Sequence, residues 1–363
     1  AVDHLAPLIH ALDATGEYSI RIVGTNFLYD IQSDSRICAL LRSEHISCTD
    51  IEDFTDKRTR ALLALWRQIS QIRRVPNILN PLLNKSRRYL QRLLLARNSR
   101  VAAKDFLFPD TGTAIDVLLA DHTDSKFSEA CVCAVQDLGG VAISFPHSTE
   151  IFSNELRGVD MLNRPQGYVS HARMLEYFNY LVVCSSTERN LVAGAVTDPM
   201  HLDKIRIIGS LRYSRRWMKL RDELMPTRKY EFPRKEPWAL KIVLLCPKRS
   251  VNIFWEELIR VVRIIASFSD HAICIKGPAQ GDQAYVTEFR RMGLDNLDVV
   301  AMEYDTSAVI DWADVVFWVD TTVFYEALLK DKPIVHLKFL WINTMFVDGH
   351  PAMWQAVCRD DMY

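Results

Sequence analysis

The chain has 363 residues, of which 49% are hydrophobic and 25% are charged, and its formal net charge is −1. This length is sufficient for two domains that each bury a core, and the composition excludes a disordered or fibrous protein. No apolar run approaches the roughly 20 residues that a membrane-spanning helix needs. The sequence therefore predicts a globular protein of two domains.

The first part of the chain alternates segments with helical and strand patterns, as is typical of an α/β domain. Later in the chain, the run at 315–319 is apolar without polar alternation, which is typical of a parallel strand buried on both faces. Because the chain opens in a helix at Ala1 rather than at Met, we expect a preceding first strand to be missing. We assign residues 1–213 to the first domain, with helices at 5–12 and 126–137 and strands at 18–23, 116–120, 141–145, 180–184 and 204–208.

A strongly basic segment interrupts this alternation. From Lys57 to Lys104 there are 13 Lys and Arg residues and no Asp or Glu. Apolar residues recur at helical spacing on both sides of Pro76, which predicts two helices. They are either ordinary surface helices or a basic amphipathic surface for anionic lipid or an anionic acceptor. The acidic remainder of the chain and the lack of an RNA-binding motif argue against nucleic acid.

Residues 214–238 are rich in Arg, Lys, Glu and Pro, and we expect them to connect the two domains. The alternation then restarts and defines a second domain at 239–363. Its expected strands are 240–245, 271–275, 299–302, 315–319 and 334–337, and its expected helices include 254–267 and 323–329. The chain's eight Cys residues show no zinc-type spacing and lie mostly in apolar runs, which indicates reduced core thiols in a cytosolic protein.

A candidate nucleotide site follows the strand at 315–319. Asp320 and Thr321 supply side-chain oxygens where a helix should begin, and a helix start at the carboxyl end of a strand favours phosphate. Glu326 comes one helical turn after Thr322, where a carboxylate can accept hydrogen bonds from ribose hydroxyls. The plain alternative is that the threonines only cap a helix and that Glu326 is a solvated helix residue.

Basic residues follow two other strands of the second domain. Lys248 and Arg249 come after the strand at 240–245, and Lys276 and Gly277 after the strand at 271–275. Cations here could compensate the charge of a leaving phosphate, and backbone groups around Gly277 could frame a base. Each could also be an ordinary loop residue.

Candidate proton acceptors lie in the first domain. His147 follows the strand at 141–145, and a histidine pKa near 6.5 suits a general base at neutral pH. Glu150 and His122 are the alternative bases. A structural histidine that is hydrogen-bonded in a turn is the competing explanation for His147.

The stretch from Thr322 to Val335 resembles the nucleotide-binding segment of GT-B glycosyltransferases. In that family a small hydroxyl residue precedes a Glu-Ala pair in a helix, and a short turn, a Pro and a buried strand follow. Thr322, Glu326-Ala327 and the run from Lys332 to Val335 match in this order, although Asp331 stands where the family commonly has Gly.

The resemblance extends over most of the chain. Within GT-B proteins the chain looks most like bacterial capsule and lipopolysaccharide transferases and the related CDP-glycerol glycerophosphotransferases. These show a comparable His at a strand end, here His147, and a Gly-x-x-Arg-Tyr element, here Gly209 to Tyr213. The usual Gly after that His is Ser148 in this chain.

The resemblance implies an α/β fold of two Rossmann-like domains that face each other across a cleft. It implies a glycosyltransferase that moves a sugar from a nucleotide-sugar donor to a lipid-linked or surface-glycan acceptor. Arg212 would contact phosphate or acceptor, or pair with an acid in the connection. We expect no metal and no cofactor, because the sequence contains no Asp-x-Asp triplet and no His/Cys cluster.

We also expect a cytoplasmic protein that contacts the inner face of the membrane through residues 57–104. The sequence ends soon after Phe346, although the last helix of this fold usually returns to the first domain, so we expect residues to be missing there too. Three alternatives stay open: a glycerol- or ribitol-phosphate transferase with a CDP donor, a sugar-nucleotide epimerase, and a non-catalytic nucleotide-sugar-binding module.

Overall fold

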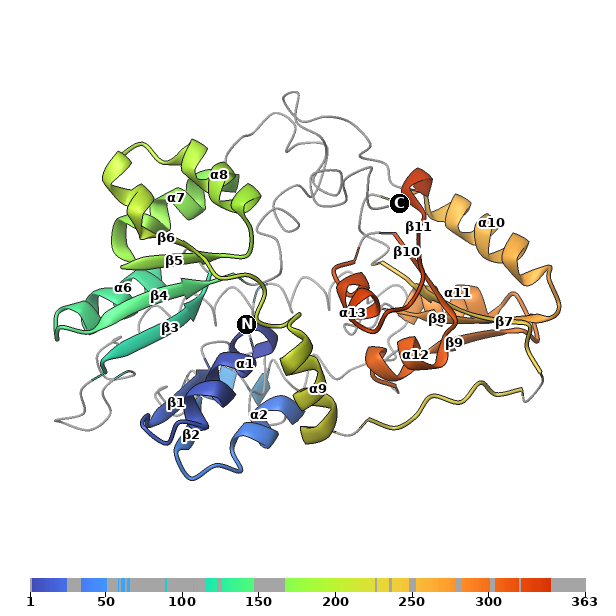
Figure 1. Ribbon diagram of the computed structural model, residues 1–363, viewed down its shortest axis with the longest axis horizontal. Coiled ribbons are helices and arrows are strands. Elements are labelled where there is room, and N and C mark those ends of the chain that lie inside the picture. The colour runs from blue at the N-terminus through green and yellow to red at the C-terminus, as the bar shows by residue number, and fades with distance from the viewer. Residues whose placement is uncertain are drawn as a thin grey trace. The chain divides into compact units, whose positions relative to one another are not determined.

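The structure is a computed structural model, shown in Figure 1. It describes residues 2–24, 34–50, 115–122, 126–146, 167–225, 227–234, 237–247, 253–277, 283–300, 304–319 and 321–340, together with 58, 60–62, 64–65, 89 and 107. These residues form two compact units, and the chain leaves the first at Gly209 and enters the second at Ser210. The two helices expected within 57–104 lie almost entirely outside the described residues.

The first unit is built from parallel strands that alternate with helices. Its four-stranded sheet has the order β3-β4-β5-β6, and β1 and β2 form a separate parallel pair. The elements in chain order are α1 (Val2–Asp13), β1 (Ile20–Gly24), α2 (Ser35–Leu40), β2 (Ile46–Asp50), β3 (Val117–Asp121), α6 (Lys126–Gln136), β4 (Val141–Phe145), α7 (Gly167–Tyr177), β5 (Tyr180–Val183), α8 (Ser186–Ala195), η5 (Pro199–Lys204) and β6 (Ile205–Ile207).

The second unit is a five-stranded parallel sheet with the strand order β11-β10-β7-β8-β9. The first strand in sequence is therefore central, two strands follow on one side of it and two on the other, which is the doubly wound Rossmann arrangement. The elements are α9 (Arg215–Leu224), β7 (Leu240–Leu245), α10 (Trp255–Ala266), β8 (His271–Lys276), α11 (Gln283–Arg290), β9 (Leu297–Val300), α12 (Thr306–Trp312), β10 (Val315–Trp318), α13 (Phe324–Leu329), β11 (Ile334–His336) and η6 (Lys338–Leu340).

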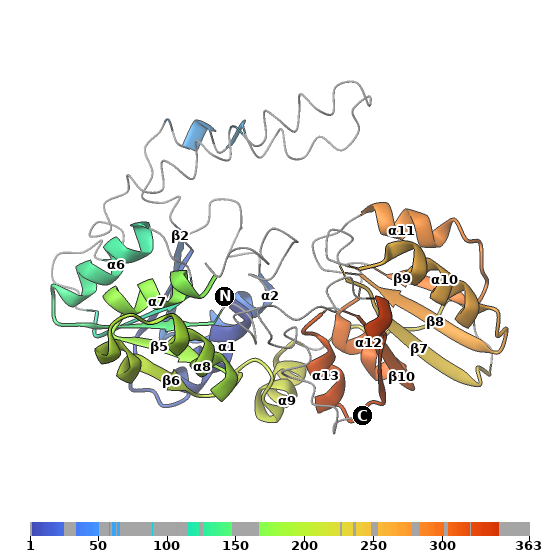
Figure 2. The ribbon, with the colours of Figure 1, turned by 90° about the horizontal axis from the view of Figure 1, so that it is seen from above.

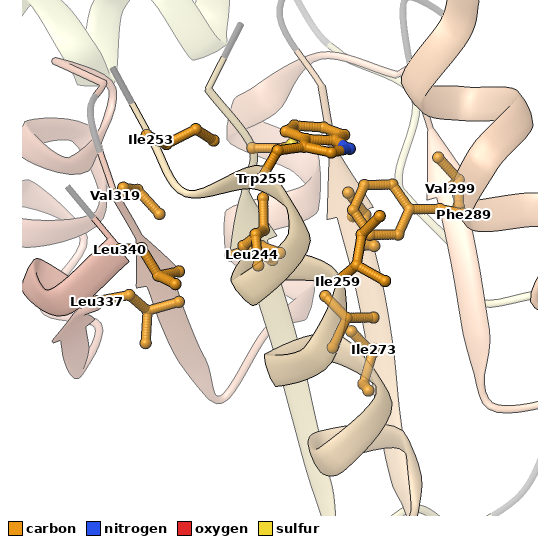
Figure 3. Packing of buried hydrophobic residues seen from close by; sticks show 14 of the residues in the cluster. Leu244, Ile253, Trp255, Ile259, Ile273, Phe289, Val299, Val319, Leu337 and Leu340 are labelled. Atoms are coloured by element: carbon orange, nitrogen blue, oxygen red, sulfur yellow. The ribbon is translucent and has the colours of Figure 1, made fainter. Parts of the chain in front are cut away.

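Helices cover both faces of this sheet, with α10 and α11 on one face and α12 and α13 on the other (Figure 2). Alternate strand residues point to opposite faces, and Leu244 and Ile273 lie in one cluster with Phe289 of α11 (Figure 3). Leu258 of α10 belongs to the same cluster. Leu258 and Phe289 are completely buried. Burial of each such side chain contributes about 1.5–3 kcal/mol, so this cluster stabilises the packing of α10 and α11 on the sheet.

The segment expected to connect the two domains packs onto the second unit. Tyr230 and Phe232 are only 5% and 7% exposed. The Tyr230 hydroxyl donates to Asp298 Oδ2 at 2.7 Å, and the Phe232 ring stacks on Trp312 at a centroid distance of 5.6 Å. The described part of 214–238 is thus held against the second unit by aromatic contacts.

The α/β class and the parallel strands predicted from the sequence are confirmed. The structure adds elements that the sequence pattern did not indicate, among them β2, α7 and α11. In β2 only Ile46 and Cys48 are apolar, and they alternate with Ser47 and Thr49. Among the described residues, β2 pairs only with β1. It has no apolar run like that of a central strand, and so the apolar pattern did not predict it.

Candidate functional site

The loop after β10 lies at the switch point of the second sheet, which is the position between β7 and β10 where the strand order reverses. Strands β7 and β10 are neighbours, and Trp318 of β10 is in register with Leu245 of β7. The connections that leave these two strands run to opposite faces of the sheet, and ligands of doubly wound sheets bind in the crevice that this creates. Thr321 and Thr322 follow β10 directly after this crevice position.

The turn into α13 differs from the expected cap. No side chain caps the helix: Val323 occupies the N-cap position, and Thr321 Oγ1 accepts only a long bond, 3.4 Å, from the Val323 N–H. The N–H groups of Tyr325 and Glu326 donate to carbonyls three residues earlier, at 3.3 and 2.9 Å. Because local bonds occupy these donors and α13 has only 6 residues, the threonine hydroxyls are the main polar groups that the turn offers.

A ladder of aromatic rings fixes the start of α13. The ring of Trp318 stacks on His336 on one side and on Phe324 on the other, each at a centroid distance of 4.1 Å. Tyr325 follows at 4.1 Å from Phe324, and Tyr213 lies 5.4 Å from Tyr325. Contacts of this kind each contribute about 0.5–1.5 kcal/mol beyond burial, so these rings connect α13 to β10, to β11 and to Tyr213, two positions before α9.

Arg212 and Tyr213 join this cluster from the Gly-x-x-Arg-Tyr element. The guanidinium of Arg212 lies 5.0 Å from the centre of the Tyr213 ring, a cation–π contact. Burial raises the pKa of Tyr213, and the charge of Arg212 and the neighbouring Thr322 side chain partly oppose this. The Tyr213 hydroxyl is buried and has no partner with hydrogen-bond geometry among the described residues. Arg212 is thus brought close to Thr322 through Tyr213, although the two are 110 positions apart in the sequence.

Glu326 is buried rather than solvated. It is 2% exposed, and its Oε1 accepts a hydrogen bond of 2.7 Å from an Nη of Arg221 in α9. Burial alone would lower the pKa of Arg221, but Glu326 and Asp222 outweigh it and raise this pKa above its ordinary value. The solvated-helix alternative for Glu326 therefore does not apply. Sequence reasoning missed Arg221, because it is one of several similar basic residues in α9.

Lys276 and Gly277 lie at the end of β8, on the far side of β7 from β10. Lys276 is 5% exposed, so it is not a solvated loop residue. It shares a strand face with Cys274, and its charge partly opposes the rise in thiol pKa that burial causes there. The Gly277 N–H donates to the Val300 carbonyl at 3.1 Å.

His122, an alternative base, directly follows β3 and is hydrogen-bonded to residues of β4 and β5 in the first unit. Its Nε2 lies 3.0 Å from the Val182 carbonyl, and its Nδ1 lies 2.7 Å from Ser144 Oγ. Because a carbonyl can only accept, Nε2 donates, and Ser144 takes the other nitrogen. Both ring nitrogens are therefore used to join β3, β4 and β5, which favours a structural role for His122.

The remaining expected site residues, His147, Glu150, Lys248 and Arg249, lie outside the described residues. His147 and Glu150 follow β4 in the sequence, and Lys248 and Arg249 follow β7. Their roles stay predictions. In the part of the chain that the structure describes, no group of three or more His, Cys, Asp or Glu side chains could hold a metal ion. No helix in that part is long and apolar enough to cross a membrane.

No family model matches the sequence, and no curated protein matches it. Solved structures do resemble it. The UDP-GlcNAc 2-epimerase of Neisseria meningitidis, bound to UDP-GlcNAc, is similar over 93% of this chain and 79% of its own, with a TM-score of 0.50 and 10% identity. The UDP-N-acetylglucosamine 2-epimerase of Rickettsia bellii is similar over 90% and 80%, with a TM-score of 0.45 and 11% identity.

The glycotransferase of kitacinnamycin is similar over 92% of this chain and 76% of its own, with a TM-score of 0.46 and 13% identity. At such identities the likeness concerns the fold. The strand order of the second sheet and the alternation of the first unit agree with it. The chain has the GT-B fold, with two Rossmann-like units built on parallel sheets.

Proposed function

We propose that this protein is a glycosyltransferase that takes a sugar from a nucleotide-sugar donor without the help of a metal ion. One observation carries the proposal: Thr321, Thr322 and the buried carboxylate of Glu326 follow β10 at the switch point of a doubly wound sheet. Crevices at such points are the usual ligand sites of this architecture. Arg212 and Tyr213 adjoin the same turn.

The second unit binds the donor. The hydroxyls of Thr321 and Thr322 donate to phosphate oxygens, and Glu326 accepts from the ribose hydroxyls. Arg212 supplies a positive charge beside Thr322, and Lys248, Arg249 and Lys276 compensate the negative charge that grows on the leaving nucleotide. Gly277 lies near the base. Fixed cations and donors stabilise a developing phosphate charge without rearrangement, which lowers the barrier for departure.

The first unit binds the acceptor. His147 takes the proton from the acceptor hydroxyl as it attacks the sugar, and Glu150 is the alternative base. The acceptor is a lipid-linked or surface glycan at the inner face of the membrane, and the basic segment 57–104 contacts anionic lipid there. Sedimentation with anionic and neutral vesicles tests this contact, and equal binding to both would contradict it.

The deciding experiment is a donor panel. The purified chain is incubated with UDP-, GDP-, CMP- and CDP-linked sugars and with CDP-glycerol and CDP-ribitol, and nucleotide release is measured with and without a glycan acceptor. Release from one sugar donor that rises with acceptor supports the proposal. Release only from CDP-glycerol or CDP-ribitol indicates the phosphate transferase, and interconversion of sugars without transfer indicates the epimerase. Binding without turnover of any compound indicates a non-catalytic module.

A further inference from the structure

Arg221 and Glu326 form a buried ion pair between two helices that are far apart in the sequence. The pair joins α9 to α13 across 105 residues, with an Nη–Oε1 distance of 2.7 Å. The side chains are 18% and 3% exposed, respectively. An arginine placed this close to a buried carboxylate determines where the carboxylate oxygens point, because its planar guanidinium offers donors in a fixed geometry.

Arg221 is itself held by further charges. Asp222 Oδ1 accepts from Nε of Arg221 at 3.2 Å and from the same Nη at 2.9 Å. The other oxygen of Asp222 lies 3.7 Å from Lys330, whose ammonium bonds both oxygens of Asp311 at 2.7 Å. The charges alternate in sign along this row, which runs over α9, α13 and α12. The guanidinium is therefore fixed before any ligand arrives.

The pair leaves Glu326 with unused acceptor capacity. Arg221 takes Oε1, and Oε2 accepts no hydrogen bond from another residue of the described ranges. A carboxylate has about four lone-pair positions, so one donor does not saturate it. The Tyr213 side chain adjoins the Thr322 side chain, and the charges of Glu326 and Arg221 also act on the Tyr213 hydroxyl. The unused acceptor positions of Glu326 are thus part of the same group of side chains as Tyr213 and Thr322, next to the turn after β10.

We infer that Arg221 is a positioning residue, which holds the Glu326 carboxylate by one oxygen so that the other accepts a ribose hydroxyl of the nucleotide. The inference rests on the proposed function, because it concerns the same nucleotide site. A carboxylate held in this way should bind ribonucleotides more tightly than deoxyribonucleotides. The selectivity then depends on Arg221 of α9, a residue that does not itself contact the ligand. A purely structural ion pair would stabilise the fold without affecting this selectivity.

The test compares the affinities of ribonucleotides and deoxyribonucleotides by calorimetry. The probes are UDP, CDP and GDP, each beside its 2′-deoxy and 3′-deoxy forms, so that no base is assumed. For the nucleotide that binds, the wild-type chain should prefer the ribose form by about 10- to 100-fold, the effect of one hydrogen bond to a charged group. Arg221→Met should bring this ratio close to one, and Arg221→Lys should restore part of it.

Arg215→Met is the matched control, because Arg215 lies on the same helix and pairs with Asp331 at 3.5 Å with both side chains largely exposed. It should leave the ratio unchanged. If Arg221→Met does not fold, Arg221→Lys and Glu326→Gln serve instead, and both should reduce the ratio. A variant at Arg221 that melts earlier but keeps the full ratio would overturn the inference, as would a wild-type chain that binds nucleotide without preference for ribose. These outcomes leave the proposed sugar transfer standing, although the second one removes the ribose contact of Glu326, whereas a wild-type chain that binds none of the probes overturns both.

Discussion

Arg221 meets Glu326 at 2.7 Å in a place where water reaches only 3% of the glutamate side chain. Removal of one partner leaves the other charge buried without compensation, which is costlier than removal of both. Arg221→Met should therefore lower the free energy of unfolding by about 3–5 kcal/mol. The double variant Arg221→Met with Glu326→Leu should recover most of this loss. Urea unfolding measures both, and a double variant as unstable as the single one would contradict the argument.

Asp331 follows α13 with a φ of 53°, in the left-handed region that glycine adopts without strain. Its N–H donates to the Leu328 carbonyl at 3.0 Å, so the conformation ends the helix. Asp331→Gly should stabilise the protein by about 0.5–1 kcal/mol, because the backbone strain is larger than the value of the exposed pair with Arg215. Thermal unfolding checks this, with Asp331→Ala as the control that should destabilise.

Substitution by alanine should have opposite effects on stability at two glycines of the first unit, Gly140 and Gly194. A Cβ on Gly140 would lie 2.3 Å from the Ile115 carbonyl oxygen and 2.5 Å from Val135 Cγ1, so the backbone would have to move. At Gly194, in α8, nothing lies within 4 Å of the added atom. Gly140→Ala should destabilise by about 1–3 kcal/mol, and Gly194→Ala should stabilise by about 0.4–1 kcal/mol. Equal effects of the two substitutions in urea unfolding would contradict this difference.

Cys131 and Cys133 lie two residues apart on α6, the first buried and the second exposed. Burial raises the pKa of Cys131 from 9.0 to about 12. The unfolded chain ionises this thiol first, so its contribution to stability is complete below pH 9 and is lost as the pH rises towards 12. The loss is at most about 1.4 kcal/mol per pH unit.

Cys131→Ala should therefore flatten the decline in the free energy of unfolding between pH 9 and pH 11. Urea unfolding at several pH values measures the decline. At pH 8 iodoacetamide should modify Cys133 well before Cys131, which mass spectrometry of the digested protein detects. Equal alkylation of the two thiols would show that Cys131 is not protected by burial.

His147 is the proposed base, and its removal should separate binding from turnover. His147→Ala should reduce the rate of sugar transfer by about 10²–10⁴-fold, the usual contribution of general base catalysis. The affinity for the donor nucleotide should stay unchanged, because the donor binds to the second unit. Initial rates and calorimetry on the same preparation check the two parts. Transfer at the wild-type rate would remove His147 from the mechanism, and Glu150→Gln is then the next variant.

Local patterns in the sequence were sufficient for much of the fold. The predicted strands at 141–145 and 240–245 correspond to β4 and β7 residue for residue, because a mostly apolar run of this length is typical of a strand buried in a parallel sheet. Asp305, a residue type that favours helix starts, caps α12 by accepting from the Ser307 N–H at 2.8 Å. The Gly139-Gly140 pair ends α6, with Gly139 at a φ of 85°. Such signals lie within a few residues of the element that they define.

The pattern failed for weakly apolar elements and for the electrostatics of the site. The spacing from Thr322 to Glu326 predicted a shared helix face, but whether Glu326 is solvated depends on α9, which is more than 100 residues away. Arg221 looks like its basic neighbours in the sequence, and only the packing of α9 selects it as the partner of Glu326. The strand order likewise arises from pairing between distant segments, and it alone puts the Thr321–Thr322 turn at the switch point. By itself the sequence determined the parallel α/β class and most of its strands, since burial demands apolar runs. The tertiary structure decided which charges meet, because that depends on long-range packing that no local spacing encodes.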